Sequence, residues 1–230
     1  DLADIMNQAF EIAGYKDAFR IEVLPEDADP MDVRYNLIQW IHRSTRGWSY
    51  GASVIDPRTG EIIKGQVSLG SLRVRQDYMI LSGLIDNPND IENKALIKKT
   101  SLDRIRQLSA HEIGHTLGFA HNYISSANNR SSVMDYPHPK IDIINGDINI
   151  DNAYSKNIGD WDKVSVRYAY TDFQENENEN IKLNEIIEEA VNKGLHFLSD
   201  SDSRPAGSAN PFSHLWDNGE FPYKELNKLI

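Results

Sequence analysis

The spacing of three histidines in the segment HEIGHTLGFAHN, residues 111–122, limits the fold of this chain more than any other feature. His111 and His115 are four residues apart, so on an α-helix they lie on one face and can bind one metal ion. His121 lies ten residues after His111, which is too far along a continuous helix to share that ion. The helix therefore has to end, and Gly118 can end it because glycine adopts the left-handed backbone conformation without steric cost.

The chemistry of these side chains indicates a catalytic zinc ion. Three neutral imidazoles with a fourth position open to water are typical of catalytic zinc sites, whereas structural sites are closed. Zinc lowers the pKa of its bound water to about 7. Glu112 is rotated by about 100° from His111, so we expect it to reach that water without binding the ion. Acting as general base and then as general acid, Glu112 would pass the proton to the leaving amine, and peptide hydrolysis is the expected reaction.

A second motif, SSVMDYP, covers residues 131–137. In isolation, Met134 would be a core residue and Tyr136 a surface residue. Together with the HExxHxxGxxH pattern, however, the chain resembles the metzincin clan of zinc endopeptidases, in which a methionine lies in a tight turn after the histidines.

The resemblance implies roles for individual residues. It implies zinc ligands at His111, His115 and His121 and a general base at Glu112. It also implies a Met-turn at Met134. In the astacin-like and serralysin-like branches a tyrosine at the position of Tyr136 ligates zinc or donates to the tetrahedral oxyanion, so Tyr136 is expected to be catalytic.

Longer segments resemble one family of large bacterial zinc-dependent metallopeptidases that also carry regions of unknown function. These segments are VRYNLIQWIHRSTRGWSYGASVIDPRTGEIIKGQVSLGSLRVRQDY, RIRQLSAHEIGHTLGFAHN, SVMDYPHP and RPAGSANPFSHLWDNG. The resemblance implies a protein that is secreted, periplasmic or associated with the cell envelope. Asn122, directly after the third histidine, differs from the usual residue of astacins, serralysins, adamalysins and matrixins, so the chain is not assigned to those branches.

The expected fold is α+β, with residues 1–230 forming a single catalytic domain. The resemblance implies an upper subdomain, residues 1–118, with a twisted mixed β-sheet, a backing helix and the active-site helix. The lower subdomain, residues 119–230, would be mostly irregular or helical and would carry the Met-turn and a C-terminal helix. We expect a cleft between the two halves at the C-terminal end of the histidine helix.

Hydrophobic spacing and turn residues predict the individual elements. Helices are expected over residues 1–13, 30–45, 71–85, 101–117, 161–170 and 181–195, and loops over 125–160. Thr100 and Asp103 suit a capping box at the start of the histidine helix. Strands are expected over residues 19–25 and in a hairpin over 51–70, where Gly65 indicates a bulge or a close backbone approach. IIKGQVSL, residues 62–69, either is an edge strand that pairs with extended substrate or pairs within the domain.

Composition excludes several classes of function. The formal net charge of −11 argues against nucleic acid as the main partner. The absence of cysteine excludes disulfides, thiolate ligands and the archaeal-type metzincin variant with a second, cysteine-rich zinc site. No segment is long and apolar enough to span a bilayer, and the start shows no signal peptide. We expect a monomer that acts on proteins or peptides and is a piece of a longer chain.

Residues outside these motifs give weaker indications of function. Single histidines without ligand spacing are usually structural or lie on the surface. We expect this of His42, His138, His196 and His214. Asp200 and Asp202 lack EF-hand spacing, so the sequence does not support a calcium site. Three alternative functions stay open: a metzincin-shaped binding protein without turnover, a peptidase selective for modified proteins such as glycoproteins, and a piece that is inert without the rest of its chain.

Overall fold

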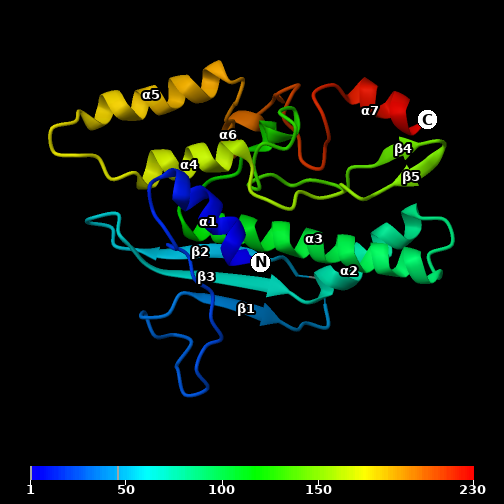
Figure 1. The fold of residues 1–230 in the computed structure, drawn as a ribbon, viewed down its shortest axis with the longest axis horizontal. Coiled ribbons are helices and arrows are strands. Elements are labelled where there is room, and N and C mark those ends of the chain that lie inside the picture. Colours follow the sequence, from blue (N-terminus) through cyan, green and yellow to red (C-terminus); the bar gives the residue numbers. More distant parts are fainter. Residues whose placement is uncertain (1, 46) are drawn as a thin grey trace. The chain divides into compact units, whose positions relative to one another are not determined.

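The computed structural model describes residues 2–45 and 47–230, and its small mixed sheet and helices confirm the predicted α+β class (Figure 1). The helices are α1 (Leu2–Ile12), α2 (Leu72–Leu84), α3 (Ile91–Thr116), the 3₁₀ helix η1 (Tyr123–Ser126), α4 (Asp160–Tyr170), α5 (Glu179–Asn192), α6 (Asp200–Ser203) and α7 (Pro222–Leu229). The strands are β1 (Leu37–Ile41), β2 (Tyr50–Ile55), β3 (Ile62–Gly70), β4 (Asp142–Ile144) and β5 (Asp147–Asn149).

The chain forms two compact units. The sheet unit consists of Glu22–Phe119 and Pro139–Lys156. The helical unit consists of Ala120–His138 and Asn157–Ile230 together with the chain up to Ile21. The expected pair of subdomains, divided at residue 118 within one catalytic domain, stays a prediction.

The three-stranded sheet of the sheet unit has the order β1-β3-β2. β1 runs parallel to β3, and β2 runs antiparallel to it with Gly51 opposite Val67. The hairpin between β2 and β3 confirms the hairpin predicted over residues 51–70. Its turn is DPRTG, residues 56–60, where the Asp56 N–H donates to the Glu61 carbonyl at 2.9 Å. The sheet is therefore mixed, as predicted.

Of the two alternatives for residues 62–69, the edge strand open to substrate is wrong. β3 pairs on both sides, so its backbone groups are used within the sheet and cannot receive a peptide. The alternative, pairing within the domain, is confirmed. The expected close approach at Gly65 is also present, because a methyl group there would lie 2.9 Å from Cβ of Thr116 in α3.

Two predictions for the segment before the sheet are wrong. Residues 19–25 form no strand, because the segment pairs with no other strand in the described residues, and Val23 is 95% exposed. Residues 30–45 form no backing helix, because turns lead directly into β1. The Asp29 carboxylate accepts from the Met31 N–H at 2.8 Å and stabilises a turn instead of a helix start. The apolar run LIQWI then pairs with β3, and this pairing overrides its helical spacing.

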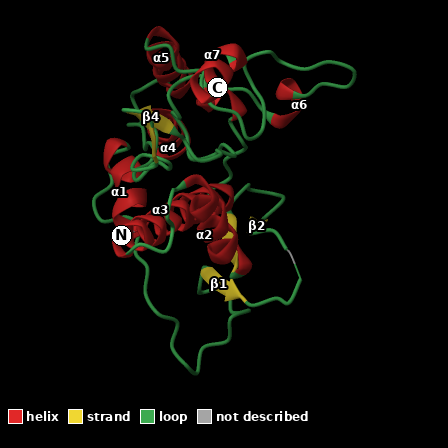
Figure 2. Cartoon of the chain, turned by 90° about the vertical axis from the view of Figure 1, so that its right-hand side faces the viewer, coloured by secondary structure: helices red, strands yellow, loops and turns green. Residues whose placement is uncertain are grey.

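α3 begins ten residues earlier than predicted. Asp90 caps it by accepting from the Glu92 N–H at 2.9 Å, so the helix begins directly after the segment NPND, residues 87–90. Thr100 and Asp103 therefore lie inside the helix and form no capping box. The first turns of α3 are stabilised by tertiary packing. α3 lies beside α2 (Figure 2), and Ile97 is in a core with residues of α2 and of the 139–156 segment.

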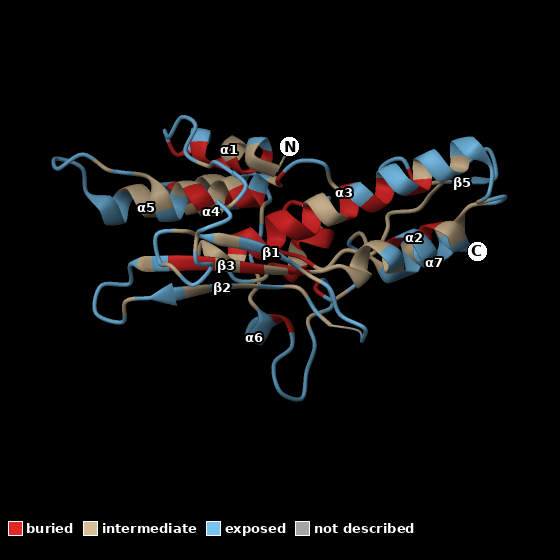
Figure 3. Cartoon of the chain, turned by 90° about the horizontal axis from the view of Figure 1, so that it is seen from below, coloured by how far each residue is buried: buried red, intermediate tan, exposed pale blue. Residues whose placement is uncertain are grey.

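Charged groups are buried between α2 and α3 as well. Asp77 forms an ion pair with Arg73, and burial raises the pKa of Asp77. Burial lowers the pKa of Arg104 to about 10, and its guanidinium lies 5.6 Å from the centre of the Tyr154 ring. Figure 3 shows buried residues along β3 and along the C-terminal half of α3, where the histidines lie. The C-terminal end of α3 is thus held in place by buried contacts with its surroundings.

The helical unit confirms three predicted helices, α1, α4 and α5. α1 packs on α4, and α4 packs on α5 (Figure 1). The ring of Phe10 contacts that of Tyr170 at 5.4 Å. Residue patterns predicted neither the short β4–β5 hairpin, which lies within the expected loop region, nor α7.

Within the described part of the chain, no helix combines the length and the apolar character needed to cross a membrane.

Candidate functional site

The end of α3 is built by its last residues and by Gly118. The Phe119 N–H donates to the Gly114 carbonyl at 3.0 Å, and the Gly118 N–H donates to the His115 carbonyl at 3.1 Å. These two bonds form a Schellman motif, which requires a left-handed residue after the helix. Gly118 provides it with φ of +89°. The chain leaves the helix axis at this point, three residues before His121.

Two histidines of α3 present ligand atoms to one point. The Nε2 atoms of His111 and His115 are 3.2 Å apart, and His111 is 1% exposed. Two nitrogens on one tetrahedral zinc ion would lie roughly 3.3 Å apart. His115 Nδ1 lies 2.8 Å from the Phe119 carbonyl, which can only accept, so the proton is on Nδ1 and Nε2 carries the lone pair that can bind a metal.

His121 completes a group of three ligand atoms. Ring nitrogens of His111, His115 and His121 lie within 4.8 Å of one another. Nδ1 of His121 lies 3.1 and 3.0 Å from the two carboxylate oxygens of Asp200, so the proton is again on Nδ1 and the metal-binding lone pair on Nε2. The donor set therefore fits a zinc ion held by three neutral imidazoles.

Glu112 lies beside the ligands and is 5% exposed. Burial raises its pKa to about 7, although a hydrogen bond from the Gly51 backbone and the positive charge of Arg104 act against this shift. Gly51 of β2 lies against the Glu112 main chain, since a methyl group on Gly51 would be 1.9 Å from the Glu112 carbonyl oxygen. A carboxyl group with this pKa can both accept and donate a proton near neutral pH.

Met134 is buried in a turn that is linked to the third histidine through the main chain. The Asn122 N–H, directly after His121, donates to the Met134 carbonyl at 2.9 Å. The Met134 N–H donates to the Ser132 hydroxyl at 3.0 Å. This hydroxyl donates in turn to the buried carboxylate of Asp162 at 2.6 Å.

Asp162 connects the Met134 turn to the start of α4. Its carboxylate also accepts from the N–H groups of Val133 at 2.8 Å and Gly159 at 2.7 Å. Burial raises the pKa of Asp162 to about 6 despite these hydrogen bonds. The backbone around Met134 is thus held by one buried acid.

Tyr136 lies in an aromatic cluster beside the third histidine. Its ring centre is 4.7 Å from that of His121 and 5.4 Å from that of Trp216, on which it stacks. The Trp216 N–H donates to the Tyr136 carbonyl at 3.0 Å, and Trp216 has a φ of +62°, a strained value for a bulky residue. Trp216 thereby fixes the position of Tyr136.

Sequence reasoning missed two neighbours of the site. Residue patterns place neither Asp200 nor Trp216 at the site. Asp200 lies 79 residues from His121 in sequence, and no spacing rule connects them. The sequence signal for Trp216 is a tryptophan within a polar C-terminal loop.

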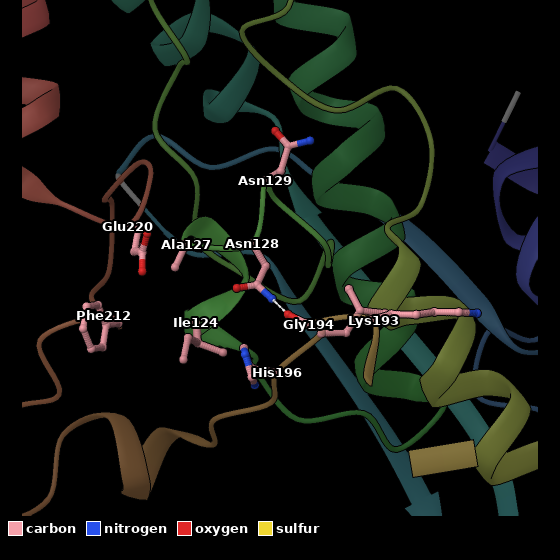
Figure 4. Close-up of a pocket in the computed structure, with 10 residues that line it drawn as sticks. Ile124, Ala127, Asn128, Asn129, Lys193, Gly194, His196, Phe212 and Glu220 are labelled. Carbon is pink, nitrogen blue, oxygen red and sulfur yellow. Dashed lines mark hydrogen bonds between the residues drawn. The ribbon is translucent and has the colours of Figure 1, made fainter. Parts of the chain in front are cut away.

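The remaining histidines lie elsewhere. Among the described residues, His42, His138, His196 and His214 belong to no group of three metal-binding side chains. His196 lines a pocket of about 620 Å³ in the helical unit, together with Ile124 and Phe212 (Figure 4). The amide of Asn128 donates to the Gly194 carbonyl at its wall. None of the predicted ligands or catalytic residues lines this pocket.

Comparison with known proteins gives one match. The sequence model of a family described as Met-zincin matches residues 93–230, which is more than half of the chain and includes all three histidines and Met134. No curated protein and no solved structure matches the chain.

Proposed function

The chain belongs to the Met-zincin family, and from this premise we propose that it is a zinc-dependent endopeptidase. The observation that carries the proposal is the convergence of the three histidine nitrogens within 4.8 Å, directly beside a buried glutamate. This combination of ligands and acid is what metal-assisted hydrolysis requires.

His111, His115 and His121 would hold the zinc. When bound, zinc lowers the pKa of water and polarises the carbonyl that is attacked. The hydrogen bonds at His115 Nδ1 and His121 Nδ1 support this assignment, because they leave both Nε2 atoms unprotonated.

Glu112 would act as general base and then as general acid. Burial raises the pKa of Glu112 toward neutrality, and its ionised form can take a proton from the attacking water. The protonated carboxyl group can then donate to the leaving amine. The hydroxyl of Tyr136, whose ring contacts His121, would donate to the oxyanion that develops on the substrate carbonyl.

β2 is the strand we propose for substrate pairing, in place of the predicted β3. In the described residues β2 pairs with β3 on one side, so its other side can accept an extended peptide. β2 also lies against α3, where Ser53 Oγ donates to the Thr116 carbonyl at 2.7 Å. A peptide on this edge would run beside the helix that carries Glu112.

The experiment that tests the function is cleavage of a peptide library by the zinc-loaded protein. We expect cleavage in wild type, loss on removing zinc with a chelator, and a decrease of at least about 10³-fold in Glu112→Gln with zinc retained. Cleavage that persists in Glu112→Gln would show that Glu112 is not the general base.

The same assay separates the alternative functions. Zinc binding without cleavage of any peptide would favour a binding protein of the same fold. Cleavage of glycosylated peptides alone would favour a peptidase for modified proteins. Activity that appears only when further chain segments are present would show that this piece is inert alone.

We further propose that the protein is a monomer that is secreted or associated with the cell envelope, as its resemblance to large bacterial metallopeptidases implies. Gel filtration should give the mass of one chain, and cell fractionation should recover the protein outside the cytoplasm.

A further inference from the structure

We propose that Asp200 is a positioning residue that orients His121 and thereby sets the affinity of the site for zinc. This inference rests on the zinc site proposed above. It gives a role to α6, the single helical turn that carries Asp200, because the function proposed above does not involve α6.

The contact between the two side chains is direct. Both carboxylate oxygens of Asp200 lie within 3.1 Å of His121 Nδ1. A carboxylate can only accept, so the proton of the neutral imidazole is fixed on Nδ1. Free imidazole can place its proton on either nitrogen, and only the Nδ1–H tautomer leaves Nε2 as a ligand. Asp200 therefore selects the binding form of His121.

A second contact orients the same group. Tyr123 is buried and stacks on the His121 ring, with ring centres 5.0 Å apart and planes 17° apart. Its side chain also hydrogen bonds to Asp200, and burial together with the carboxylate charge raises the pKa of Tyr123. The carboxylate thus interacts with the edge of the imidazole and with the ring that covers its face, so rotation of His121 breaks both contacts.

The chain holds Asp200 in place through the residue next to His121. The side chain of Asn122 is fully buried, donates to the His196 carbonyl at 2.9 Å and accepts from the Leu198 N–H at 3.0 Å. The segment leading into α6 is therefore attached to the residue that follows the third histidine. Ser199 caps α6 by accepting from the Asp202 N–H. This explains why an asparagine suits position 122 in this chain.

The expected effect is on metal binding. A carboxylate that accepts from a ligand imidazole increases the basicity of the other ring nitrogen and reduces the freedom of the ring. Loss of such a partner typically weakens metal affinity by about 10- to 100-fold. Asp200 is half exposed, with 49% of its side chain accessible, so its removal leaves no large cavity.

The test is the zinc dissociation constant of the whole 230-residue chain, measured at one pH by competition with a chromogenic chelator. We expect Asp200→Ala to bind zinc about 10- to 100-fold more weakly than wild type. Asp200→Asn, which keeps an acceptor but loses the charge, should fall between the two. Asp202→Asn, on the same turn, is the matched control, because the Asp202 carboxylate accepts from the Ser199 hydroxyl at 2.8 Å; it should bind zinc as wild type does.

A second measurement distinguishes positioning from a general structural role. The ¹⁵N shifts of the His121 ring in zinc-free protein should show the Nδ1–H tautomer in wild type and a mixture in Asp200→Ala. The melting temperatures of the zinc-free proteins should be equal within a few degrees.

The outcomes separate this inference from the function on which it rests. Tight zinc binding by wild type with an equal dissociation constant in Asp200→Ala, or an unchanged tautomer, would overturn the role of Asp200 alone. A wild-type chain that binds no zinc would overturn the zinc site itself, and the role of Asp200 with it.

Discussion

Gly51→Ala is expected to reduce catalysis strongly while leaving the protein folded. A methyl group at this position would lie 1.9 Å from the carbonyl oxygen of Glu112, 2.7 Å from its carbonyl carbon and 3.0 Å from its Cα. These are main-chain atoms of a buried helix, so no side-chain rotation relieves the contact. β2 and α3 would have to separate by roughly 1.5 Å to reach ordinary van der Waals distances.

The magnitude follows from this displacement. Overpacking a close interface costs about 1–3 kcal/mol in unfolding free energy, which for a chain of this size lowers the melting temperature by about 2–12 °C. Displacing a catalytic group by about 1 Å can cost on the order of 100-fold in rate. Glu112 moves with the displaced turn and loses its hydrogen bond from Gly51, so we expect kcat/KM to fall by about 100-fold.

The assay combines peptide cleavage, zinc content and urea unfolding. Gly70→Ala at the end of β3 is the matched control, because the nearest atom to its new methyl group is the Gly47 carbonyl oxygen at 3.8 Å. This control should keep kcat/KM within about twofold of wild type, since surface changes without a clash are nearly neutral. A Gly51→Ala variant with wild-type kcat/KM would refute the idea that the contact between β2 and α3 positions Glu112.

Three further predictions concern other parts of the site. Tyr136→Phe should lower kcat by about 100-fold with KM and zinc content unchanged, because it removes an oxyanion donor. An unchanged kcat would show that the Tyr136 hydroxyl takes no part in catalysis. Gly118→Ala should lower the unfolding free energy in urea by about 1–2 kcal/mol, because φ is +89° at this position; equal stability would contradict the need for glycine. The folded pKa of Asp162, about 6, lies above its ordinary value of 3.8, so its contribution to stability is present below pH 4 and is lost as the pH rises through 6. In chelator, the unfolding free energy of wild type relative to Asp162→Asn should therefore fall by about 2 kcal/mol between pH 4 and pH 7. A rise over this range would contradict the prediction.

The sequence was most informative where local chemistry decides the structure. The end of the histidine helix at Gly118 follows from one glycine and from ligand spacing alone, and the DPRTG hairpin follows from turn residues. Strongly periodic helices such as α5 were also found, because their apolar face is visible in the sequence.

The errors share a physical cause, which is pairing and packing with distant residues. LIQWI fits a helical spacing, but the parallel partner β3 makes it a strand. The first turns of α3 are polar and lack a periodic face, yet Ile97 packs in a core completed by Ile150 and Tyr154 about fifty residues later. Asp200 reaches His121 for the same reason, through a tertiary contact that local patterns do not encode.

The direction of α3 has an electrostatic consequence for the metal site. Its 26 residues point their carbonyl groups toward Thr116, so the aligned peptide dipoles place roughly half a negative charge at the end where His115 lies. Three neutral imidazoles contribute no charge to balance a divalent cation. The helix end therefore supplies negative potential that neutral ligands would lack, so ending α3 at the proposed metal site would favour a cation as well as bring His121 within reach.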